Sequence, residues 1–300
     1  MKDILVTGGA GQIGIELGRL NWGSEIRVHS PTRAELELSS IDSVRAYLSR
    51  HAFAAVINAA AYTSVDRAEG EVAEAFAANA LGPAVLAGVT ANADVPLIQI
   101  STDYVFTGDQ HAPYAEDDPV GPLSVYGASK LAGELAVRSG NPRSVVLRTA
   151  WVLSPHRVNF LKTMLRLSAS RAEINVVADQ IGCPTSAADI AGAIHVILMA
   201  HLADQAAPAG VYHFVNAGEA SWCELANTIF ALASDRAPRT IARPITTAEY
   251  PTMARRPANS RLSTAKITRD FGVTPRSWHD AVADILADLQ HTKSTPGADQ

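Results

Sequence analysis

Short apolar runs alternate with longer amphipathic segments along the first half of the chain. The short runs predict strands at residues 4–7, 26–29, 55–58, 97–101 and 145–149. The longer segments predict helices at residues 11–20, 41–50, 72–92 and 126–139. Strands that alternate with helices are typical of an α/β fold, here a doubly wound parallel sheet of the Rossmann type, covered by helices on both faces.

The pattern becomes irregular after Trp151. Helices are expected at residues 160–171, 187–202, 222–234 and 279–290, with short strands and proline-bearing loops between them. We therefore expect residues 1–150 to form the Rossmann domain. Residues 151–300 are expected to form mainly a smaller α/β substrate-binding lobe, with some segments returning to the Rossmann domain. The active site would lie between them, beyond the carboxyl ends of the strands.

Composition and charge narrow the class of protein. Hydrophobic residues make up 47% of the 300 residues and charged residues 18%, which is typical of a globular chain with an ample core. With a net charge of -5 and no basic run, binding to nucleic acid or to an anionic membrane is not expected. There is no uninterrupted apolar stretch of about 18 residues and no pattern of a signal peptide. Cys183 and Cys223 have neither metal-ligand spacing nor an obvious pairing, so a reduced, cytoplasmic protein is expected.

A glycine-rich turn follows the first predicted strand. It fits two registers, Gly9-x-Gly11-x-x-Gly14 and Gly8-x-x-Gly11-x-x-Gly14. Glycines in this context provide a tight turn and a bare backbone that a dinucleotide diphosphate can approach. Because a strand precedes the turn and a helix follows it, dinucleotide binding is favoured over a purely structural turn. The expected cofactor contacts here are Gly8, Gly11, Gln12, Ile13 and Gly14.

The end of the second predicted strand bears on the choice between NAD and NADP. An acidic residue at this point would bind the ribose 2′-hydroxyl of NAD, but the chain continues with Ser30, Pro31, Thr32 and Arg33. Ser30 and Arg33 could hold a 2′-phosphate, which favours NADPH. Glu35 and Glu37 lie close enough in sequence to leave NADH open, and Arg33 as an ordinary surface residue is an equally simple interpretation.

Tyr126 and Lys130 are the candidate catalytic pair. A spacing of four places both side chains on one face of a helix, where the ammonium is expected to favour the phenolate and lower the Tyr126 pKa. Thr102 follows a predicted strand and could hydrogen-bond a substrate carbonyl beside Tyr126. A Tyr and a Lys four apart also occur on ordinary helix surfaces. The order of glycine turn, residues 58–61, Thr102 and then the pair favours the catalytic interpretation.

Several stretches resemble the extended short-chain dehydrogenase/reductases and, within them, the dTDP-4-dehydrorhamnose reductase family. The superfamily stretches are GQIG at 11–14, NAAAYTSVD at 58–66 and STDYVF at 101–106. The more specific ones are NFLKTM at 159–164, DQIGCPT at 179–185 and RPANS at 256–260. The resemblance implies NADPH-dependent reduction of the C4 keto group of dTDP-4-dehydro-L-rhamnose, a small-molecule sugar nucleotide, to dTDP-L-rhamnose.

The resemblance also implies roles for individual residues. Thr102, Tyr126 and Lys130 would be the catalytic trio, with Tyr126 and Lys130 also contacting the cofactor together with Ala59, Ala60, Ala61 and Tyr62. Substrate contacts would come from Thr102, Asp103, Trp151, Asn159, Arg256 and Asn259. Some family members bind magnesium through three carboxylates, and the matching positions here are Glu16, Asp189 and Asp288. Solvated acids on helix faces are the simpler interpretation of these three.

Other functions stay open at the level of sequence. One is another sugar-nucleotide reductase or an epimerase of the same superfamily. Another is a non-catalytic regulatory subunit, because relatives of this family serve as partners of methionine adenosyltransferase. Neither the configuration produced at C4, rhamnose or talose, nor the oligomeric state follows from the sequence, although relatives often form homodimers.

Overall fold

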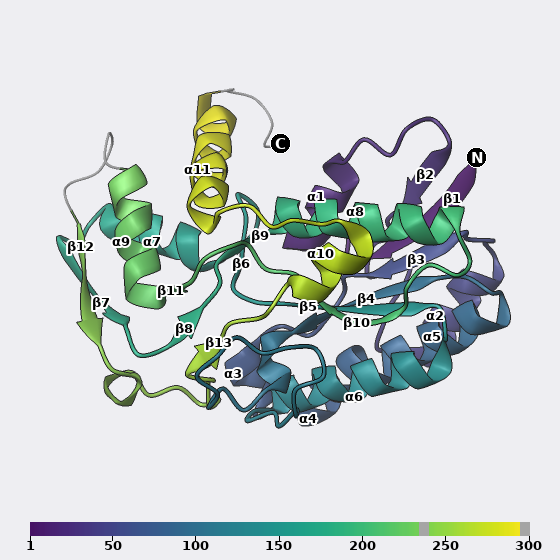
Figure 1. Cartoon of the computed structure of the whole chain (residues 1–300), viewed down its shortest axis with the longest axis horizontal. Helices are drawn as coiled ribbons and strands as arrows, with labels where there is room; N and C mark the ends of the chain where they lie inside the picture. The colour runs from purple at the N-terminus through teal and green to yellow at the C-terminus, as the bar shows by residue number, and fades with distance from the viewer. Residues whose placement is uncertain (234–239, 295–300) are drawn as a thin grey trace.

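A parallel sheet forms the centre of the protein in the computed structural model, which describes residues 1–233 and 240–294. Within these residues the sheet has six strands in the order β10-β5-β4-β3-β1-β2, all parallel (Figure 1). The strands are β1 (Lys2–Thr7), β2 (Ile26–His29), β3 (Ala55–Asn58), β4 (Leu97–Thr102), β5 (Ser144–Thr149) and β10 (Gly210–His213). The prediction of a doubly wound parallel sheet is confirmed, and its first five strands agree with the expected positions to within one or two residues.

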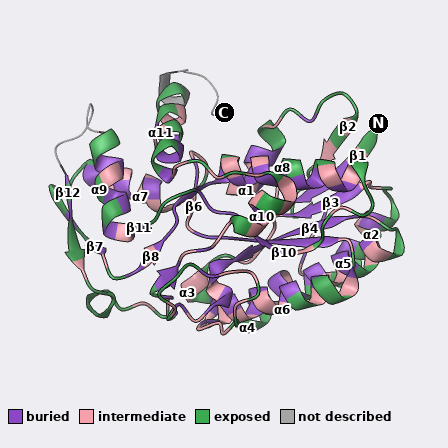
Figure 2. Cartoon of the chain, viewed as in Figure 1, coloured by how far each residue is buried: buried purple, intermediate pink, exposed green. Residues whose placement is uncertain are grey.

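Helices cover both faces of this sheet (Figure 1). The first face carries α1 (Gln12–Arg19), α8 (Ala187–Ala203) and α10 (Ala265–Phe271), and the second carries α2 (Ile41–Ser49), α5 (Gly82–Asn92) and α6 (Val125–Gly140). Alternate residues of a strand point to opposite faces, so Ile4 packs with the first group and Leu5 with the second. Figure 2 shows the consequence, because the inner strands of the sheet are buried, while the edge strand β2 is only partly buried and the outer surfaces of the helices are exposed.

The helix expected over residues 72–92 contains an irregular turn. It is divided into α4 (Val72–Phe76), a π-helical turn η1 (Ala77–Leu81) and α5. By length and composition this is the only helix in the described part of the chain that could cross a membrane. Its buried residues Leu86 and Ala87 pack with strand residues of the sheet, as those of a core helix do. π-Helical turns occur frequently at functional sites.

A smaller group of elements lies beside the sheet (Figure 1). Leu161 of α7, Leu225 and Ile229 of α9, and Val282 of α11 form its separate apolar core. Short strands join it: β7 with β12, β6 with β9, and β11-β8-β13. The bounds are β6 (Val152–Leu153), α7 (Phe160–Ser168), β7 (Glu173–Val177), β8 (Ile181–Gly182), β9 (Thr185–Ser186), β11 (Ala220–Ser221), α9 (Trp222–Leu232), β12 (Ile241–Ile245), β13 (Asn259–Ser260) and α11 (Trp278–Ser294). The remaining short helices are α3 (Val65–Ala68), η2 (Asp103–Val105) and η3 (Thr247–Glu249).

The second half of the chain also contributes to the central sheet. Strand β10 pairs with β5, with Tyr212 opposite Leu147, and α8 packs its buried residues against α1 and the sheet. The sequence pattern did not predict β10. In this half, α7 ends three residues before its expected end, and Ser234, the expected end of α9, lies outside the described residues. The division of the chain at residue 150 stays a prediction.

Candidate active site

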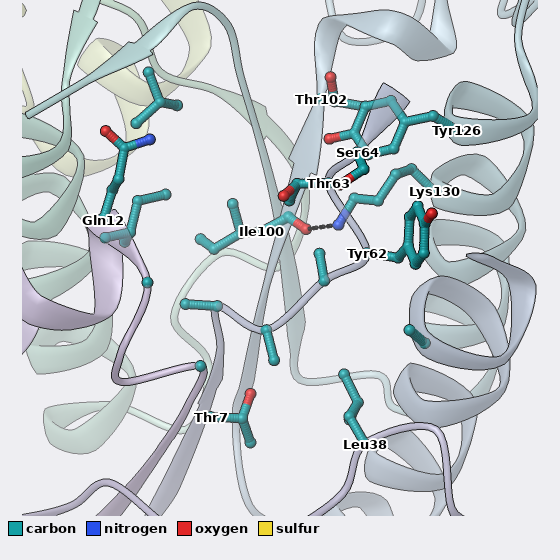
Figure 3. Close-up of a pocket in the computed structure, with 18 of the residues that line it drawn as sticks. Thr7, Gln12, Leu38, Tyr62, Thr63, Ser64, Ile100, Thr102, Tyr126 and Lys130 are labelled. Carbon is teal, nitrogen blue, oxygen red and sulfur yellow. Dashed lines mark hydrogen bonds between the residues drawn. The ribbon is translucent and has the colours of Figure 1, made fainter. Parts of the chain in front are cut away.

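A cavity of about 1170 Å³ lies at the carboxyl ends of the central strands. Its wall includes Thr7 at the end of β1, Ala59 after β3, Thr102 at the end of β4 and Thr149 at the end of β5. Figure 3 shows Gln12 on one side of this cavity and Tyr126 with Lys130 on the other. This is the place where open α/β sheets bind their ligands.

The glycine turn forms one end of the cavity. Gly8 has a φ of +72°, and its carbonyl accepts a hydrogen bond from the Gly11 amide at 2.8 Å. A Cβ on Gly14 would lie 2.2 Å from the Gly8 oxygen, so no side chain fits there. Helix α1 begins after Gly11 without a side-chain cap, which leaves amide donors at its N-terminus for an anion. The turn therefore fits the diphosphate of a dinucleotide.

The residues expected at the cofactor ribose lie near this turn. The Ser30 hydroxyl packs so closely against Gly9 that a Cβ on Gly9 would lie 1.6 Å from it. Arg33 lines the cavity and forms an ion pair with Glu37, while Glu35 accepts hydrogen bonds from the Thr32 amide and hydroxyl. Glu35 and Glu37, the two acids that left NADH open as the cofactor, thus each contact neighbouring residues.

Helix α6 positions the catalytic pair. Ser124 caps this helix, accepting a hydrogen bond from the Gly127 amide at 3.2 Å, and Tyr126 and Lys130 follow on one face. The Tyr126 phenol lies beside the Thr102 hydroxyl, so the structure brings the predicted trio together (Figure 3). The Lys130 ammonium donates a hydrogen bond to the carbonyl oxygen of Ile100 at 2.6 Å.

The prediction that Lys130 lowers the Tyr126 pKa is wrong for this structure. Burial raises the Tyr126 pKa above its usual value, and the Thr102 hydroxyl opposes this only in part. Burial also lowers the Lys130 pKa to about 8, with Glu134 acting in the opposite direction. Taking a charged group out of water outweighs the benefit of a neighbouring charge here. Tyr126 consequently keeps its proton near neutral pH, as a proton donor must.

A buried ion pair lies behind the catalytic helix. Arg148 of β5 forms a two-pronged contact with Glu134 of α6, the shortest distance being 2.7 Å, and Ser101 of β4 also donates to Glu134. Arg148 and Glu134 are 2% and 1% exposed. Glu134 lies one helical turn after Lys130, so the pair holds the catalytic face of α6 against the strands. Sequence reasoning missed this residue, although the same spacing of four that marked Lys130 could have indicated it.

Asn79 is a second residue that sequence reasoning missed. It lies in the π-helical turn η1, where its side-chain oxygen accepts from the Tyr62 amide at 2.8 Å and its amide donates to the Tyr62 carbonyl. The same amide also donates to the Ser129 hydroxyl on α6 at 3.0 Å. Asn79 thereby fixes the loop 59–62, which lines the cavity, to the helix that carries Tyr126 and Lys130.

Asp103 lies at the cavity wall next to Thr102. Its Oδ1 accepts a hydrogen bond from the Thr102 hydroxyl at 3.0 Å, and the side chain is almost fully buried. Burial raises the Asp103 pKa to about 6, while hydrogen bonds from Ser260 and Thr102 oppose the shift. A buried carboxylate without a cation is costly, which explains the direction.

The residues expected around the sugar nucleotide separate into two groups. Trp151 lines the cavity, stacks on Trp222 with ring centroids 3.5 Å apart, and has a φ of +47°. Asn159 instead caps α7 and donates to Gln12, and Asn259 donates to the Gln110 and Ala112 carbonyls. Arg256 forms an ion pair with Asp66 at 2.9 Å. Only Asp103 and Trp151 of the expected sugar contacts, besides Thr102, lie on the cavity wall itself.

The three carboxylates expected to hold magnesium do not fit that role. Each has a basic partner: Arg276 binds Asp189 at 2.9 Å, Arg19 binds Asp288 at 3.3 Å, and His156 Nε2 lies 3.0 Å from Glu16. Within the described residues, no cluster of three or more His, Cys, Asp or Glu could hold a metal ion. Arg276 at Asp189, and Arg19 at both Asp288 and Glu16, already supply the positive charge that a divalent cation would bring to these positions.

A bare glycine turn and a helix that carries Tyr126 and Lys130, both facing one cavity, define an oxidoreductase of the short-chain dehydrogenase/reductase class. Residues 1–291 match the family described as RmlD substrate binding domain. A dTDP-4-dehydrorhamnose reductase of Sinorhizobium fredii is 44% identical over 285 residues, which cover 94% of this chain and 96% of that protein. The chain belongs to the RmlD substrate binding domain family, and several of its relatives are named dTDP-4-dehydrorhamnose reductase.

Solved structures agree with this family. A dTDP-4-dehydrorhamnose reductase from Clostridium acetobutylicum superposes with a TM-score of 0.90 at 34% identity, covering 96% of this chain and 99% of that one. The enzyme of the same name from Bacillus anthracis, solved in complex with NADP, gives a TM-score of 0.89 at 33% identity, covering 96% of this chain and all of the other.

Proposed function

We propose that this protein reduces the C4 keto group of dTDP-4-dehydro-L-rhamnose with NADPH, giving dTDP-L-rhamnose. The observation that carries the proposal is the Tyr126 phenol beside the Thr102 hydroxyl, in the same cavity as the glycine turn. A phenol that can give up its proton, next to a second hydroxyl, suits a carbonyl oxygen that gains negative charge. Membership of the family is the reason for choosing this sugar nucleotide as the substrate.

The chemistry then follows from the residues present. The bound cofactor would supply a hydride to C4. As the C4–H bond forms, Tyr126 gives its proton to the carbonyl oxygen, which becomes the 4-hydroxyl, and Thr102 orients that oxygen. Lys130 would contact the nicotinamide ribose, and the Tyr126 phenolate regains its proton from solvent.

We assign the cofactor to the glycine-turn side of the cavity. Gly8, Gly11, Gln12, Ile13 and Gly14 would contact the diphosphate, and the loop 59–62 with Tyr126 and Lys130 would contact the nicotinamide half. NADPH is favoured over NADH because Arg33 lines the cavity at the end of β2 and because the Bacillus anthracis relative was solved with NADP. Ser30 would support this end through its contact with Gly9.

The sugar nucleotide would occupy the side of the cavity next to the smaller lobe. Asp103 and Trp151 would contact it directly, since both line the cavity. Asn159, Arg256 and Asn259 would act from behind the wall, through the hydrogen bonds and the ion pair described above.

A turnover assay tests the proposal. The protein is incubated with dTDP-4-dehydro-L-rhamnose and NADPH or NADH, the loss of reduced cofactor is followed by absorbance, and NMR identifies the C4 configuration of the product. Stoichiometric oxidation of NADPH with formation of the rhamnose product is expected. Conversion of substrate without net loss of reduced cofactor would indicate an epimerase, and absence of turnover on any keto sugar would indicate a regulatory subunit. A talose product would overturn the assigned stereochemistry.

A further inference from the structure

Four cationic side chains line the cavity within the described residues, and they differ in how their charge is balanced. Arg33 forms an ion pair with Glu37, and Arg67 forms one with Glu71. Lys130 is buried at the catalytic end. Arg157, the fourth, has no carboxylate within ion-pair distance in the part of the chain that the structure describes. It is therefore the lining guanidinium whose charge is available to a ligand.

Arg157 reaches the glycine turn from the segment after β6. Its Nε donates a hydrogen bond to the carbonyl oxygen of Ala10 at 2.6 Å, although the two residues are 147 positions apart. This uses one of the five N–H donors of the guanidinium, and both terminal nitrogens keep theirs for another partner. The side chain is exposed and lines the same cavity as residues 8–13.

The segment 154–159 holds Arg157 in this place. Ser154 and Asn159 both donate to the Gln12 side-chain oxygen, at 2.7 and 3.0 Å. Arg157 itself has a φ of +54°, in the left-handed region that residues other than glycine rarely adopt. A backbone kept in such a conformation at a cavity wall is a frequent mark of a functional position. The segment is thus a strap from the smaller lobe, fixed to the start of α1.

The glycine turn lacks a cation of its own. Residues 8–14 contain no Lys or Arg, so only backbone amides and the α1 N-terminus oppose the negative charge of a diphosphate there. A guanidinium is suited to this task, because its planar fork can donate parallel hydrogen bonds to phosphate oxygens. We propose that Arg157 binds the diphosphate of the dinucleotide cofactor, beside the glycine turn. This inference rests on the proposed function, since it requires that the turn holds NADPH.

The experiment measures cofactor binding to the intact protein by isothermal titration calorimetry. Arg157→Asn removes the charge with a residue that tolerates a positive φ, and Arg157→Lys keeps the charge without the fork. Arg166→Gln is the matched control, because it removes an exposed guanidinium of α7 that does not line the cavity. The ligands are NADPH, NADH and adenosine 2′-monophosphate, which lacks a diphosphate.

Arg157→Asn is expected to raise the Kd of NADPH and of NADH alike by about tenfold, the loss of one charged hydrogen-bonding partner. Arg157→Lys should raise these Kd values less, and the Kd values of Arg166→Gln should match those of the wild type. Binding of adenosine 2′-monophosphate should not change in any variant, which shows that the turn stays intact.

Three results would overturn the assignment. Unchanged dinucleotide affinity in Arg157→Asn would leave the residue without this role. An increase only in the KM of the sugar nucleotide would transfer the role to the substrate diphosphate. Equal losses for NADPH and adenosine 2′-monophosphate would make Arg157 a structural latch on Ala10. Failure of the wild-type protein to bind either dinucleotide would instead refute the proposed function.

Discussion

Lys130 and Ile100 are joined by a hydrogen bond of 2.6 Å between the ammonium and the backbone carbonyl oxygen. Lys130 is only 4% exposed, so this bond anchors its charge to strand β4 below the cavity. The ammonium is thus held by the sheet, and burial dominates the ionisation of both Lys130 and Tyr126. The catalytic pair consists of a protonated phenol and a cation whose pKa has moved toward neutrality.

The buried ammonium predicts a pH dependence of stability. Its pKa falls from 10.5 to about 8 on folding, so between these values the unfolded chain holds a proton that the folded protein has lost. The destabilisation is fully present below about pH 8 and is relieved as the pH rises through this window. Urea denaturation at about pH 7.5 and about pH 9.5 should show the wild type gaining about 2 kcal/mol relative to Lys130→Met. An equal change in the free energy of unfolding of the two proteins between these pH values would contradict the burial of a charged Lys130.

Tyr126→Phe tests the proton donor. The variant keeps the ring and its edge-to-face contact with Tyr104 but lacks the hydroxyl beside Thr102. We expect kcat to fall by about 10²- to 10⁴-fold, the usual contribution of general acid catalysis, with little change in the Kd of NADPH. Tyr250→Phe is the control, because Tyr250 is 59% exposed. Wild-type turnover in Tyr126→Phe would remove the proton-donor role.

The buried Arg148–Glu134 pair predicts a large loss of stability when one partner is removed. Glu134→Leu leaves the Arg148 guanidinium buried without its carboxylate, which typically costs about 3–5 kcal/mol. Glu134→Leu combined with Arg148→Met removes both charges and should recover most of the loss. Chemical denaturation of the wild type, both single variants and the double variant gives the coupling energy. Additive losses would show that the two groups do not depend on each other.

Gly14→Ala tests the close approach at the glycine turn. The new Cβ would lie 2.2 Å from the Gly8 oxygen and 2.6 Å from the Gly9 Cα, so the turn must shift. NADPH binding should weaken by at least about tenfold, because the displaced amides lose charged hydrogen bonds to the diphosphate. Gly18→Ala is a matched control on the same helix, since a Cβ there meets nothing within 4 Å. Equal affinities in both variants would argue against a diphosphate at this turn.

Removal of divalent metal is expected to have no effect. The carboxylates that would otherwise hold magnesium are each paired with a basic side chain: Arg276, Arg19 or His156. Turnover and Tm should therefore be the same in EDTA and in added magnesium. A Tm that rises with magnesium concentration would show a metal site that these ion pairs do not exclude.

The sequence predicted the central architecture well. Alternating apolar runs located β1 to β5, because a strand buried on both faces needs a continuous apolar segment. Strand β10 was missed because it lies in the irregular second half of the chain, and it pairs with β5, about 65 positions earlier. The ordered motifs also placed Thr102, Tyr126 and Lys130 in one cavity, because the carboxyl ends of parallel strands share one edge of the sheet.

The sequence could not decide which partner each of several charged side chains contacts in the folded protein. It determined the glycine turn, the Tyr126–Lys130 spacing and the family, since these depend on residues that are near one another in the chain. Tertiary structure decided that Lys130 binds Ile100, that Arg276 binds Asp189, and that Arg157 reaches Ala10. These contacts join residues from 30 to 147 positions apart, so neither spacing nor composition indicates them. Burial and ion pairing depend on the packed environment, and that environment exists only after the chain has folded.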